Sequence, residues 1–437
     1  MFWLSSIMST AFALDIPHEY YTLDNGLQVI LIEDHSLPKV VVDTWYGVGS
    51  FDDPKGASGF AHLFEHLMFM GTKRIPEKEF DQRMEIGGGW NNASTADNRT
   101  NYYDVGSSEL IDLLLFMEAD RMTGLDITQE KLDLQREVVR NERRQNYEDA
   151  PYGKVWLEIP EMLYPESHPY FREGIGSHED LLAATLDTVS NFYADWYVPN
   201  NATLCVAGDF DPAHVKARIN EWYGPLKASD EVKHLEVELP STPVVKEKTV
   251  TDNITLPALI MIWHSPVIYK DGDAEADILS SVLSGQAKAR LTSRLVYEEQ
   301  MVQDVQVFQW SRQKGSLFIA YVDVKPDVDL EKIKVLVQSE IDSIASGENP
   351  VTSQELQAII NNWEMGFLWG LEDVLERAET VQSYLFYQGD SDYLSQDLQR
   401  YQNVTAEGIQ KFAAQYLTSE KSSTLIVLPK EEKELEK

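Results

Sequence analysis

The order of expected elements repeats along this chain, and the repeat limits the folds that it can adopt. In the first half a Leu-Pro pair precedes the β-rich run 39–45, and in the second half another Leu-Pro pair precedes the run 258–263. Each half then continues with a helix, and closes with a helix followed by an apolar strand, at 203–208 and 423–428. The pattern indicates a duplicated α+β unit of about 210 residues, larger than any solenoid repeat.

The length of the chain agrees with this division. A chain of 437 residues is too long for one ordinary core, so two or three domains are expected. A stretch rich in Pro, Lys, Glu and Ser separates the two copies, as expected for a surface linker. The sequence therefore predicts an N-terminal domain at 14–226, a linker at 227–248 and a C-terminal domain at 249–430.

Composition excludes several classes of protein. The formal net charge of −35 argues against binding of nucleic acid or anionic membranes, because phosphate contacts need clusters of Lys and Arg. The same charge would draw in positively charged peptides, although it could equally serve solubility alone. No run of about 18 apolar residues follows the N-terminus, so no stable membrane insertion is expected.

The first residues form a short apolar segment. Residues 2–13 resemble the core of a signal peptide and end in an A-x-A pattern, but the usual positive n-region is missing. We interpret residues 1–13 as the remnant of a signal peptide, and expect a periplasmic or secreted protein of a Gram-negative bacterium. The alternative is a cytoplasmic protein with a short buried or interfacial N-terminal segment.

The strongest chemical motif is the run His62-Leu63-Phe64-Glu65-His66. Residues four apart on a helix lie on the same side, so the two imidazoles can converge on one metal ion, with Glu65 beside them. This H-x-x-E-H order is called the inverzincin signature. Neutral imidazole is a good Zn²⁺ ligand, and an unligated carboxylate can take a proton from metal-bound water. The flanking residues are apolar, and buried polar groups need partners, which favours a metal over two isolated histidines.

A catalytic zinc site usually has three protein ligands and an open fourth position. The stretch from Glu130 to Asn146 is expected to be a long amphipathic helix. Its apolar positions would be Leu132, Leu134, Val138 and Val139. Three glutamates of this stretch, Glu130, Glu137 and Glu142, are candidate ligands, and helical geometry alone does not choose among them.

Nearly the whole chain resembles the pitrilysin/insulinase family of zinc peptidases, which includes the mitochondrial processing peptidase and the core proteins of respiratory complex III. The matching segments beyond the histidine motif are Asn25-Gly26, Gly47-Val48-Gly49-Ser50, Gly71-Thr72, Asn92-Ala93-Ser94-Thr95, Tyr197-Val198-Pro199-Asn200-Asn201-Ala202 and Gly208-Asp209.

The resemblance implies a fold and a set of site residues. Both copies would be α/β sandwiches, each an antiparallel-rich sheet flanked by helices. Glu142 would complete the site as the third ligand of one zinc per chain, with His62 and His66. The positions matching the metal helix in the second copy, around 274–284, hold no histidine, so only the first copy would carry zinc.

The resemblance also places Asn92, Ala93, Ser94 and Thr95 on a strand edge beside the metal, where substrate would add as an extra β-strand. Three glycines at 87–89 precede this segment, but a phosphate-binding loop would need a Lys-Ser/Thr ending, which is missing.

One departure from the family pattern concerns the helix of Glu142. Relatives often have a supporting glutamate one heptad earlier, where this chain has Gln135, so zinc affinity could differ.

Together these features predict a zinc metalloendopeptidase that hydrolyses extended peptides or unfolded segments. Glu65 would assist attack by zinc-bound water and then protonate the leaving amine. One alternative is a non-catalytic scaffold or assembly subunit of the same fold. Another is a peptide-binding subunit, which suits the second half better than the first. Retention of all four motif residues favours the enzyme.

The resemblance further implies a chamber closed by two such chains, in which the facing chain supplies an Arg and a Tyr seven residues apart. They would follow Ser293-Arg294-Leu295, with the Arg within 296–300 and the Tyr within 303–307, and neither window holds the required residue. Arg290 and Tyr297 have the right separation but come too early. We therefore expect a heterodimer with a related subunit that lacks the zinc motif and keeps the pair, rather than a homodimer.

Overall fold

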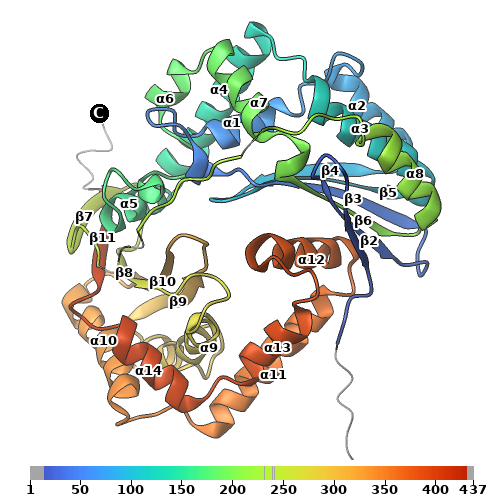
Figure 1. Cartoon of the computed structure of the whole chain (residues 1–437). Coiled ribbons are helices and arrows are strands. Elements are labelled where there is room, and N and C mark those ends of the chain that lie inside the picture. Colours follow the sequence, from blue (N-terminus) through green and yellow to red (C-terminus); the bar gives the residue numbers. More distant parts are fainter. Residues whose placement is uncertain (1–13, 231, 239, 241, 431–437) are drawn as a thin grey trace, which may run out of the picture.

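The computed structural model describes residues 14–230, 232–238, 240 and 242–430. In it, two halves of similar architecture lie one above the other, each built on one sheet (Figure 1). The apolar segment 1–13 lies outside the described residues, so the prediction for it is not addressed by the structure.

The first half contains a six-stranded sheet in the order β1-β2-β6-β3-β5-β4. Its strands are β1 (Glu19–Thr22), β2 (Gln28–Glu33), β3 (Lys39–Tyr46), β4 (Trp90–Thr95), β5 (Thr100–Ser107) and β6 (Ala202–Gly208). Its helices are α1 (Phe60–Leu67), α2 (Glu77–Ile86), α3 (Ile111–Gly124), α4 (Gln129–Arg143), α5 (Lys154–Leu163), α6 (His178–Ala183), α7 (Leu186–Trp196) and α8 (Pro212–Trp222), with the π-helical turn η3 (Arg144–Glu148) continuing α4.

The second half contains a five-stranded sheet in the order β7-β11-β8-β10-β9. Its strands are β7 (Glu247–Asp252), β8 (Ala258–Ser265), β9 (Val302–Trp310), β10 (Ser316–Val324) and β11 (Ser423–Pro429). Its helices are α9 (Asp273–Leu283), α10 (Leu330–Ser346), α11 (Ser353–Gly370), α12 (Val374–Gln388), α13 (Leu394–Gln402) and α14 (Ala406–Tyr416), with the π-helical segment η6 (Thr292–Glu298) before β9.

Apart from β1, which has no counterpart among the described strands of the second half, the two sheets have the same topology. In chain order β7, β8, β9, β10 and β11 correspond to β2, β3, β4, β5 and β6, and the strand order across each sheet then agrees. The one parallel pair named in each sheet, β2 with β6 and β7 with β11, also occupies the same place. The expected α+β class and the internal duplication are thereby confirmed. Strand β7 begins at Glu247, two residues before the predicted start of the second domain.

A matched glycine sets the register between the two copies. Gly59 before α1 and Gly272 before α9 both have positive φ, at 86° and 94°, a conformation that glycine adopts without steric cost. Counting from these glycines, the positions of His62, Glu65 and His66 hold Glu275, Ile278 and Leu279. The equivalent helix of the second half therefore lacks every side chain of the motif.

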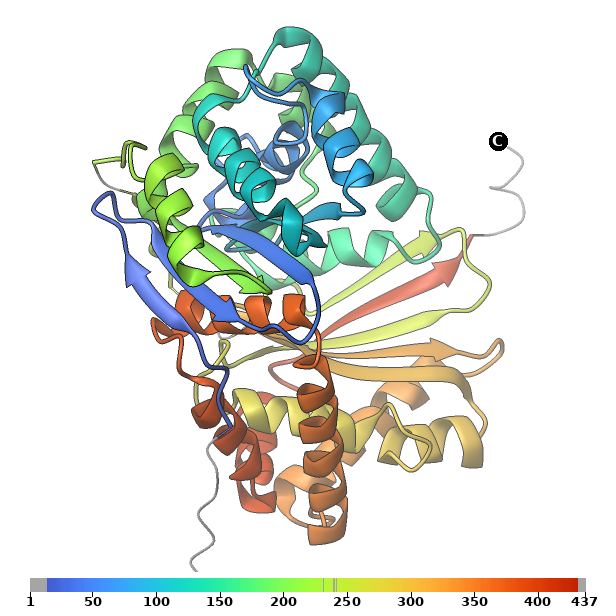
Figure 2. The ribbon, with the colours of Figure 1, turned by 90° about the vertical axis from the view of Figure 1, so that its right-hand side faces the viewer.

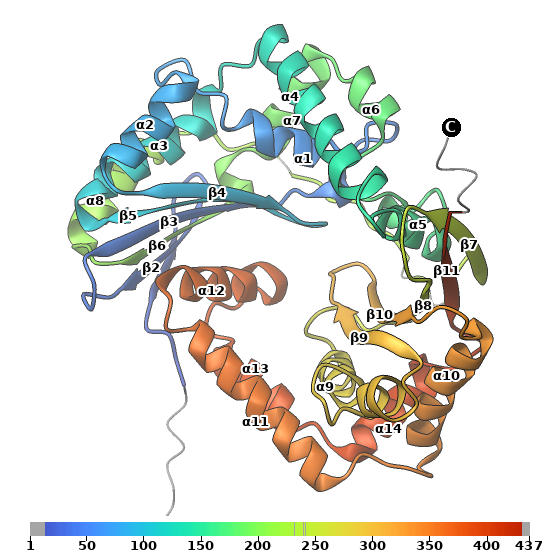
Figure 3. The same cartoon turned by 180° about the vertical axis from the view of Figure 1, so that it is seen from behind.

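Each sheet buries one face under helices of its own half and the other face under a helix of the opposite half. Helix α5, from the first half, packs on the second sheet, and helix α12, from the second half, packs on the first sheet (Figure 3). Figure 2 shows α12 directly against the blue and green strands. The residues of α12 in this contact are Val374, Ala378, Val381, Tyr384 and Leu385. Because α5 and α12 occupy equivalent places in the repeat, the exchange is reciprocal.

Candidate metal centre

Helix α1 is short and strongly amphipathic. Phe60, Leu63, Phe64 and Leu67 recur at the spacing of one helical face and are all buried in the core of the first half. That packing leaves His62, Glu65 and His66 on the other face. The N-terminus of α1 is held by Asp53, whose two carboxylate oxygens accept hydrogen bonds from Gly59 N and Ala61 N at 2.7 and 2.8 Å. The first turn, which carries His62, is fixed in this way.

Helix α4 brings the third side chain. Leu132 and Val139, seven residues apart, are fully buried and orient the helix against the core. Two of the four expected apolar positions were wrong, since Leu134 and Val138 are 51% and 39% exposed. Glu142 lies in the last turn, three residues beyond Val139 and close to the same face.

The side chains of His62, His66 and Glu142 converge. One potential ligand atom from each residue lies within 4.8 Å of the other two. Glu142 Oε2 is 3.7 Å from His62 Nε2 and 3.4 Å from His66 Nε2, too long for strong hydrogen bonds. Ligand atoms about 2.0–2.1 Å from one zinc ion at the tetrahedral angle lie about 3.3 Å apart. The donor set and its spacing therefore fit a zinc ion.

The electrostatics of the three groups are coupled. Burial lowers the pKa of His62 below its usual value, which favours the neutral imidazole that a metal needs. At His66 burial also acts downward, but the carboxylates of Glu142 and Glu65 outweigh it and raise the pKa. The hydrogen-bonding contact with His66 in turn lowers the pKa of Glu142, so this carboxylate is ionised and able to act as a ligand.

The supporting contacts of the two imidazoles differ. Gln135 Oε1 lies 3.3 Å from His66 Nδ1, and the amide of Gln135 donates to Met70 Sδ at 2.7 Å. The residue that departs from the family pattern thus still contacts the imidazole. His62 Nδ1 is buried and has no hydrogen-bond partner among the described residues. The other candidate on α4, Glu137, is exposed and paired with Arg140.

Glu65 lies beside the end of strand β4. Its Oε2 accepts a hydrogen bond from Thr95 Oγ1. Among the described strands, β4 is the last of its sheet and pairs only with β5, so its other edge is open for main-chain pairing. The structure therefore brings Thr95, and with it the strand 90–95, next to Glu65. Neither this hydrogen bond nor the Asp53 cap was foreseen from sequence. Asp53 lies six residues before Gly59, outside the N-cap position at which a capping side chain is recognised.

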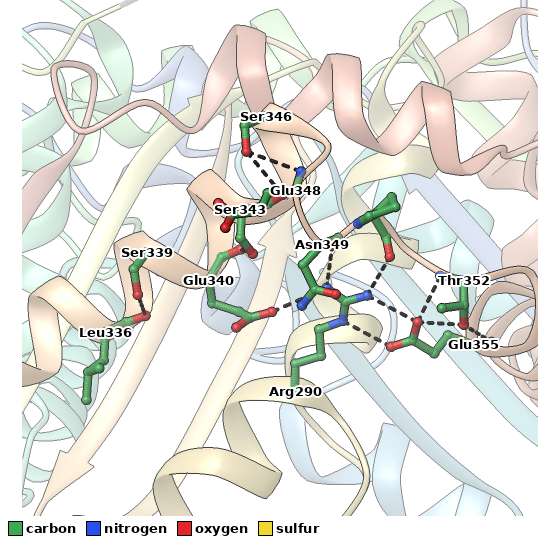
Figure 4. Close-up of polar contacts among 11 residues, drawn as sticks. Arg290, Leu336, Ser339, Glu340, Ser343, Ser346, Glu348, Asn349, Thr352 and Glu355 are labelled. Atoms are coloured by element: carbon green, nitrogen blue, oxygen red, sulfur yellow. Dashed lines mark hydrogen bonds and ion pairs between the residues drawn. The ribbon is translucent and has the colours of Figure 1, made fainter.

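Arg290 and Tyr297 are not placed as a substrate-binding pair. Figure 4 shows the Arg290 guanidinium enclosed by the α10–α11 region. It donates to both oxygens of Glu355, to Glu340 and to the carbonyl of Asn349. Tyr297, in η6, is 58% exposed. Arg290 is thus a structural arginine that ties the segment before η6 to the two helices.

No helix within the described residues combines the length and apolar character that a bilayer crossing needs.

Comparisons with known proteins agree with the fold and the motif. Residues 28–162 match the sequence profile described as insulinase (peptidase family M16), and residues 183–362 match the profile described as the peptidase M16 inactive domain. The first match contains the histidine motif and Glu142. The second covers most of the half that lacks the motif.

Two curated relatives are similar over almost their whole length. The zinc protease PqqE of Helicobacter pylori is 28% identical over 94% of this chain and 93% of its own. The uncharacterized zinc protease YmxG of Bacillus subtilis is 22% identical over 93% of this chain and 97% of its own.

A crystal structure of a protease from Helicobacter pylori superimposes with a TM-score of 0.88 at 26% identity, and covers 95% of this chain and all of its own. A putative M16-like peptidase from Alicyclobacillus acidocaldarius shares the fold, with a TM-score of 0.83 at 20% identity, over 96% of this chain and all of its own. With both halves matched and the topology shared, the chain belongs to the pitrilysin/insulinase (M16) family.

Proposed function

We propose that this chain is a zinc metalloendopeptidase that hydrolyses extended peptides or unfolded segments. The observation that carries the proposal is the convergence of His62, His66 and Glu142 at ligand spacing, with the carboxylate of Glu65 on the same face of α1. These three residues would hold one Zn²⁺ per chain. When bound, the ion would supply Lewis-acid polarisation of the scissile carbonyl and lower the pKa of water.

In this proposal Glu65 moves the proton. Thr95 Oγ1 fixes Oε2 of Glu65, which leaves Oε1 as the oxygen to accept a proton from the attacking water. The same carboxyl then returns the proton to the nitrogen of the leaving amine. The hydroxyl of Thr95 thus orients the base while leaving it accessible.

Strand β4 would bind the substrate. An extended peptide can pair with the open edge of β4 along Asn92, Ala93, Ser94 and Thr95, and so lie beside Glu65. Main-chain pairing makes few demands on sequence. The peptide would add a further strand to the sheet of the first half.

The test separates metal binding from turnover. Glu65→Gln should retain near-stoichiometric zinc, measured by elemental analysis, and lose nearly all cleavage of a quenched fluorescent peptide. His62→Ala, His66→Ala and Glu142→Ala should lose the metal. Glu137→Ala, on the same helix as Glu142 but exposed, is the matched control and should keep both properties. Retained activity in Glu65→Gln would show that another group is the base.

A second candidate function is that of a non-catalytic scaffold subunit. The profile matching 183–362 is described as an inactive domain, which favours this function for the second half. The first half keeps the four motif residues. A chain that binds no zinc after purification from zinc-supplemented medium would support the scaffold and exclude the peptidase.

The partner remains part of the proposal. Arg290 is fully engaged within its own half, so this chain offers no free Arg–Tyr pair at that position to a facing copy. We expect a related subunit without the zinc motif to supply it. Zinc-loaded chain assayed alone and with such a subunit decides the point, since full activity of the chain alone would argue against a heterodimer.

Export is likewise a proposal that rests on the apolar segment 2–13 of the sequence. We expect the protein in the periplasm or medium of a Gram-negative bacterium. Fractionation of cells expressing the full chain would test this expectation, and exclusive recovery in the cytoplasm would contradict it.

A further inference from the structure

Equivalent hairpin turns of the two sheets meet at the junction between the halves. Residues 96–99 join β4 to β5, and residues 311–315 join β9 to β10. Tyr170, in the 3₁₀ turn η4 (Pro169–Phe171), lies between the two turns. Its hydroxyl donates to Asn98 Oδ1 at 2.7 Å and accepts from Lys314 N at 3.2 Å. The turn that follows the proposed substrate-binding strand is thus connected to the half that lacks the histidine motif.

Arg312, in the turn of the second half, crosses this junction. Its side chain is 4% exposed. Its guanidinium lies among three aromatic rings, at 4.3 Å from the centroid of Tyr170, 4.5 Å from that of Trp310 and 5.3 Å from that of Tyr164. Nε donates to the Gly315 carbonyl at 3.0 Å, and Nη2 donates to the Tyr164 hydroxyl at 2.5 Å. Groups from both halves therefore fix the place of this guanidinium.

Asp97, in the turn of the first half, is the anion that pairs with this buried cation. Its Oδ2 is 3.6 Å from Nη1 of Arg312, which forms no other ion pair within the described part of the chain. On its other side Asp97 rests on the 3₁₀ turn η1 (Ser50–Asp52). Phe51 N donates to the Asp97 carbonyl at 2.8 Å, and Ser50 Oγ donates to Oδ1 at 3.4 Å. Because an unpaired charge in the interior is costly, loss of the ion pair would displace Asp97 or its surroundings.

The position of Asp97 bears on the proposed catalytic base. Asp97 comes two residues after Thr95, and the Thr95 hydroxyl donates to Oε2 of Glu65. The rest of β4 is held by its pairing with β5, from Trp90 to Thr95, in which Arg312 takes no part. A displacement of the turn would therefore act mainly on the last residue of the strand, and through it on the orientation of the Glu65 carboxylate.

We propose that Arg312 is a positioning residue for the proposed hydrolysis. Its pairing with Asp97 fixes the turn after β4, and this turn sets the place of the Thr95 hydroxyl that orients Glu65. Arg312 acts through Asp97, not by contact with the metal ligands. The role rests on the proposed peptidase function, and it makes turnover depend on a residue of the half that lacks the histidine motif.

Kinetics of the zinc-loaded full chain, with its partner subunit if one is required, give the first test. Arg312→Met keeps an unbranched aliphatic stem and removes the charge and the donors. We expect kcat for a quenched fluorescent peptide to fall about 10- to 100-fold, because a shift of about 1 Å at a reacting group costs up to about 100-fold. KM should change by less than about threefold, since the pairing of β4 with β5 remains. Zinc content should not change.

Two further variants separate positioning from a general loss of stability. Arg312→Lys keeps a charge that can pair with Asp97 but loses the planar group among the rings, so kcat should fall by less than about tenfold. Arg400→Met is the matched control. Arg400 is a partly buried arginine of the second half that pairs with Asp273 at 2.7 Å and Asp397 at 2.6 Å. Its loss should lower stability and leave kcat unchanged.

A double-mutant cycle with Thr95→Val decides whether Arg312 acts through the hydroxyl. In the Thr95→Val background, Arg312→Met should lower kcat by less than about threefold further, because the contact that it positions is already gone. The same loss in both backgrounds, or an unchanged kcat in Arg312→Met alone, would overturn the proposal. If Arg312→Met does not fold, Asp97→Asn removes the same ion pair from the other side and enters the same cycle.

Hydrogen exchange keeps this inference separate from the proposed function, since it needs no cleavage. Measured by mass spectrometry on full-length chains, the amides of residues 95–99 should exchange faster in Arg312→Met than in the unaltered chain, and at the unaltered rate in Arg400→Met. Faster exchange in a chain that cleaves no peptide would retain the effect of Arg312 on the turn and reject the peptidase. Unchanged exchange in an active chain would do the reverse.

Discussion

The cap on helix α1 offers a quantitative test of how the metal centre is held. Asp53 accepts backbone hydrogen bonds from Gly59 and Ala61 at 2.7 and 2.8 Å. Replacing it by Ala removes both acceptors. A buried backbone donor left without its acceptor costs about 1–3 kcal/mol, and water can partly replace the acceptor because Asp53 itself is partly exposed, although Gly59 and Ala61 are buried. We therefore expect Asp53→Ala to lower the free energy of unfolding by about 2–4 kcal/mol.

The loss should be concentrated at the metal centre. His62 lies in the first turn of α1, directly after the two capped amides, and α1 has only eight residues. Zinc binding must then re-form that turn, so part of the lost free energy appears in the zinc Kd. If about 1.4 kcal/mol of the lost free energy of folding is spent on re-forming the turn, zinc binding weakens about tenfold. If the whole loss of about 4 kcal/mol is spent in this way, zinc binding weakens by about a thousandfold at most. We expect a weakening of at least about tenfold.

The matched control is Asp211, which caps α8 on the surface through Ala213 N and His214 N. Asp211→Ala should cost about 1 kcal/mol of stability and leave zinc affinity unchanged. Urea unfolding of the metal-free protein and competition with a zinc-binding dye measure the two quantities. Asp53→Asn, which keeps one acceptor, should fall between. Unchanged zinc affinity in Asp53→Ala would refute the argument that the cap positions His62.

Three further predictions concern single contacts. Gln135→Glu should tighten zinc binding about tenfold, because a charged acceptor on Nδ1 of His66 makes the imidazole more basic. Gln135→Ala should weaken zinc binding by a similar factor. Competition with a zinc-binding dye measures both affinities. Thr95→Val should lower kcat with unchanged zinc content, because Glu65 loses its orienting hydroxyl; an unchanged kcat would exclude that role. Burial lowers the pKa of His264 to about 4. Unfolding then takes up a proton between about pH 6.5 and 4, so the free energy of unfolding falls as pH drops, by about 1.4 kcal/mol per unit, and His264→Gln should flatten this slope in urea midpoints.

Local patterns in the sequence were sufficient to predict the helix that carries the histidine motif. The H-x-x-E-H spacing and the flanking apolar residues fix which face of α1 is buried, because both follow from helical periodicity. The choice of Glu142 over Glu130 and Glu137 needed the family resemblance, because helical periodicity alone does not distinguish among three glutamates of one helix. Leu134 and Val138 show the same limit, because an apolar residue on a long helix can remain exposed.

The exchange of α5 and α12 could not be read from the sequence. Both helices carry apolar faces, and the pattern says that a face is buried without naming the sheet that covers it. A division into consecutive domains assumes that each half covers its own sheet. Here the second face of each sheet is covered by a helix of the other half. The local sequence pattern of a helix does not indicate such a long-range contact.

The exchange gives the half that lacks the histidine motif a direct influence on the proposed site. On α12, Gln382 donates to Asp43 of β3, and Glu379 accepts a hydrogen bond from Asn101 of β5 at 2.7 Å. Asn101 also accepts from Ser94 of β4, at 2.7 Å. A continuous set of hydrogen bonds therefore runs from the second half, through the central strands, to the strand whose end holds Glu65. Because buried polar groups are costly to leave unpaired, displacement of α12 would disturb β4 as well as the apolar face beneath it. The half that lacks the histidine motif thus still supports the proposed site of the other half, which is a physical reason for it to remain in the chain.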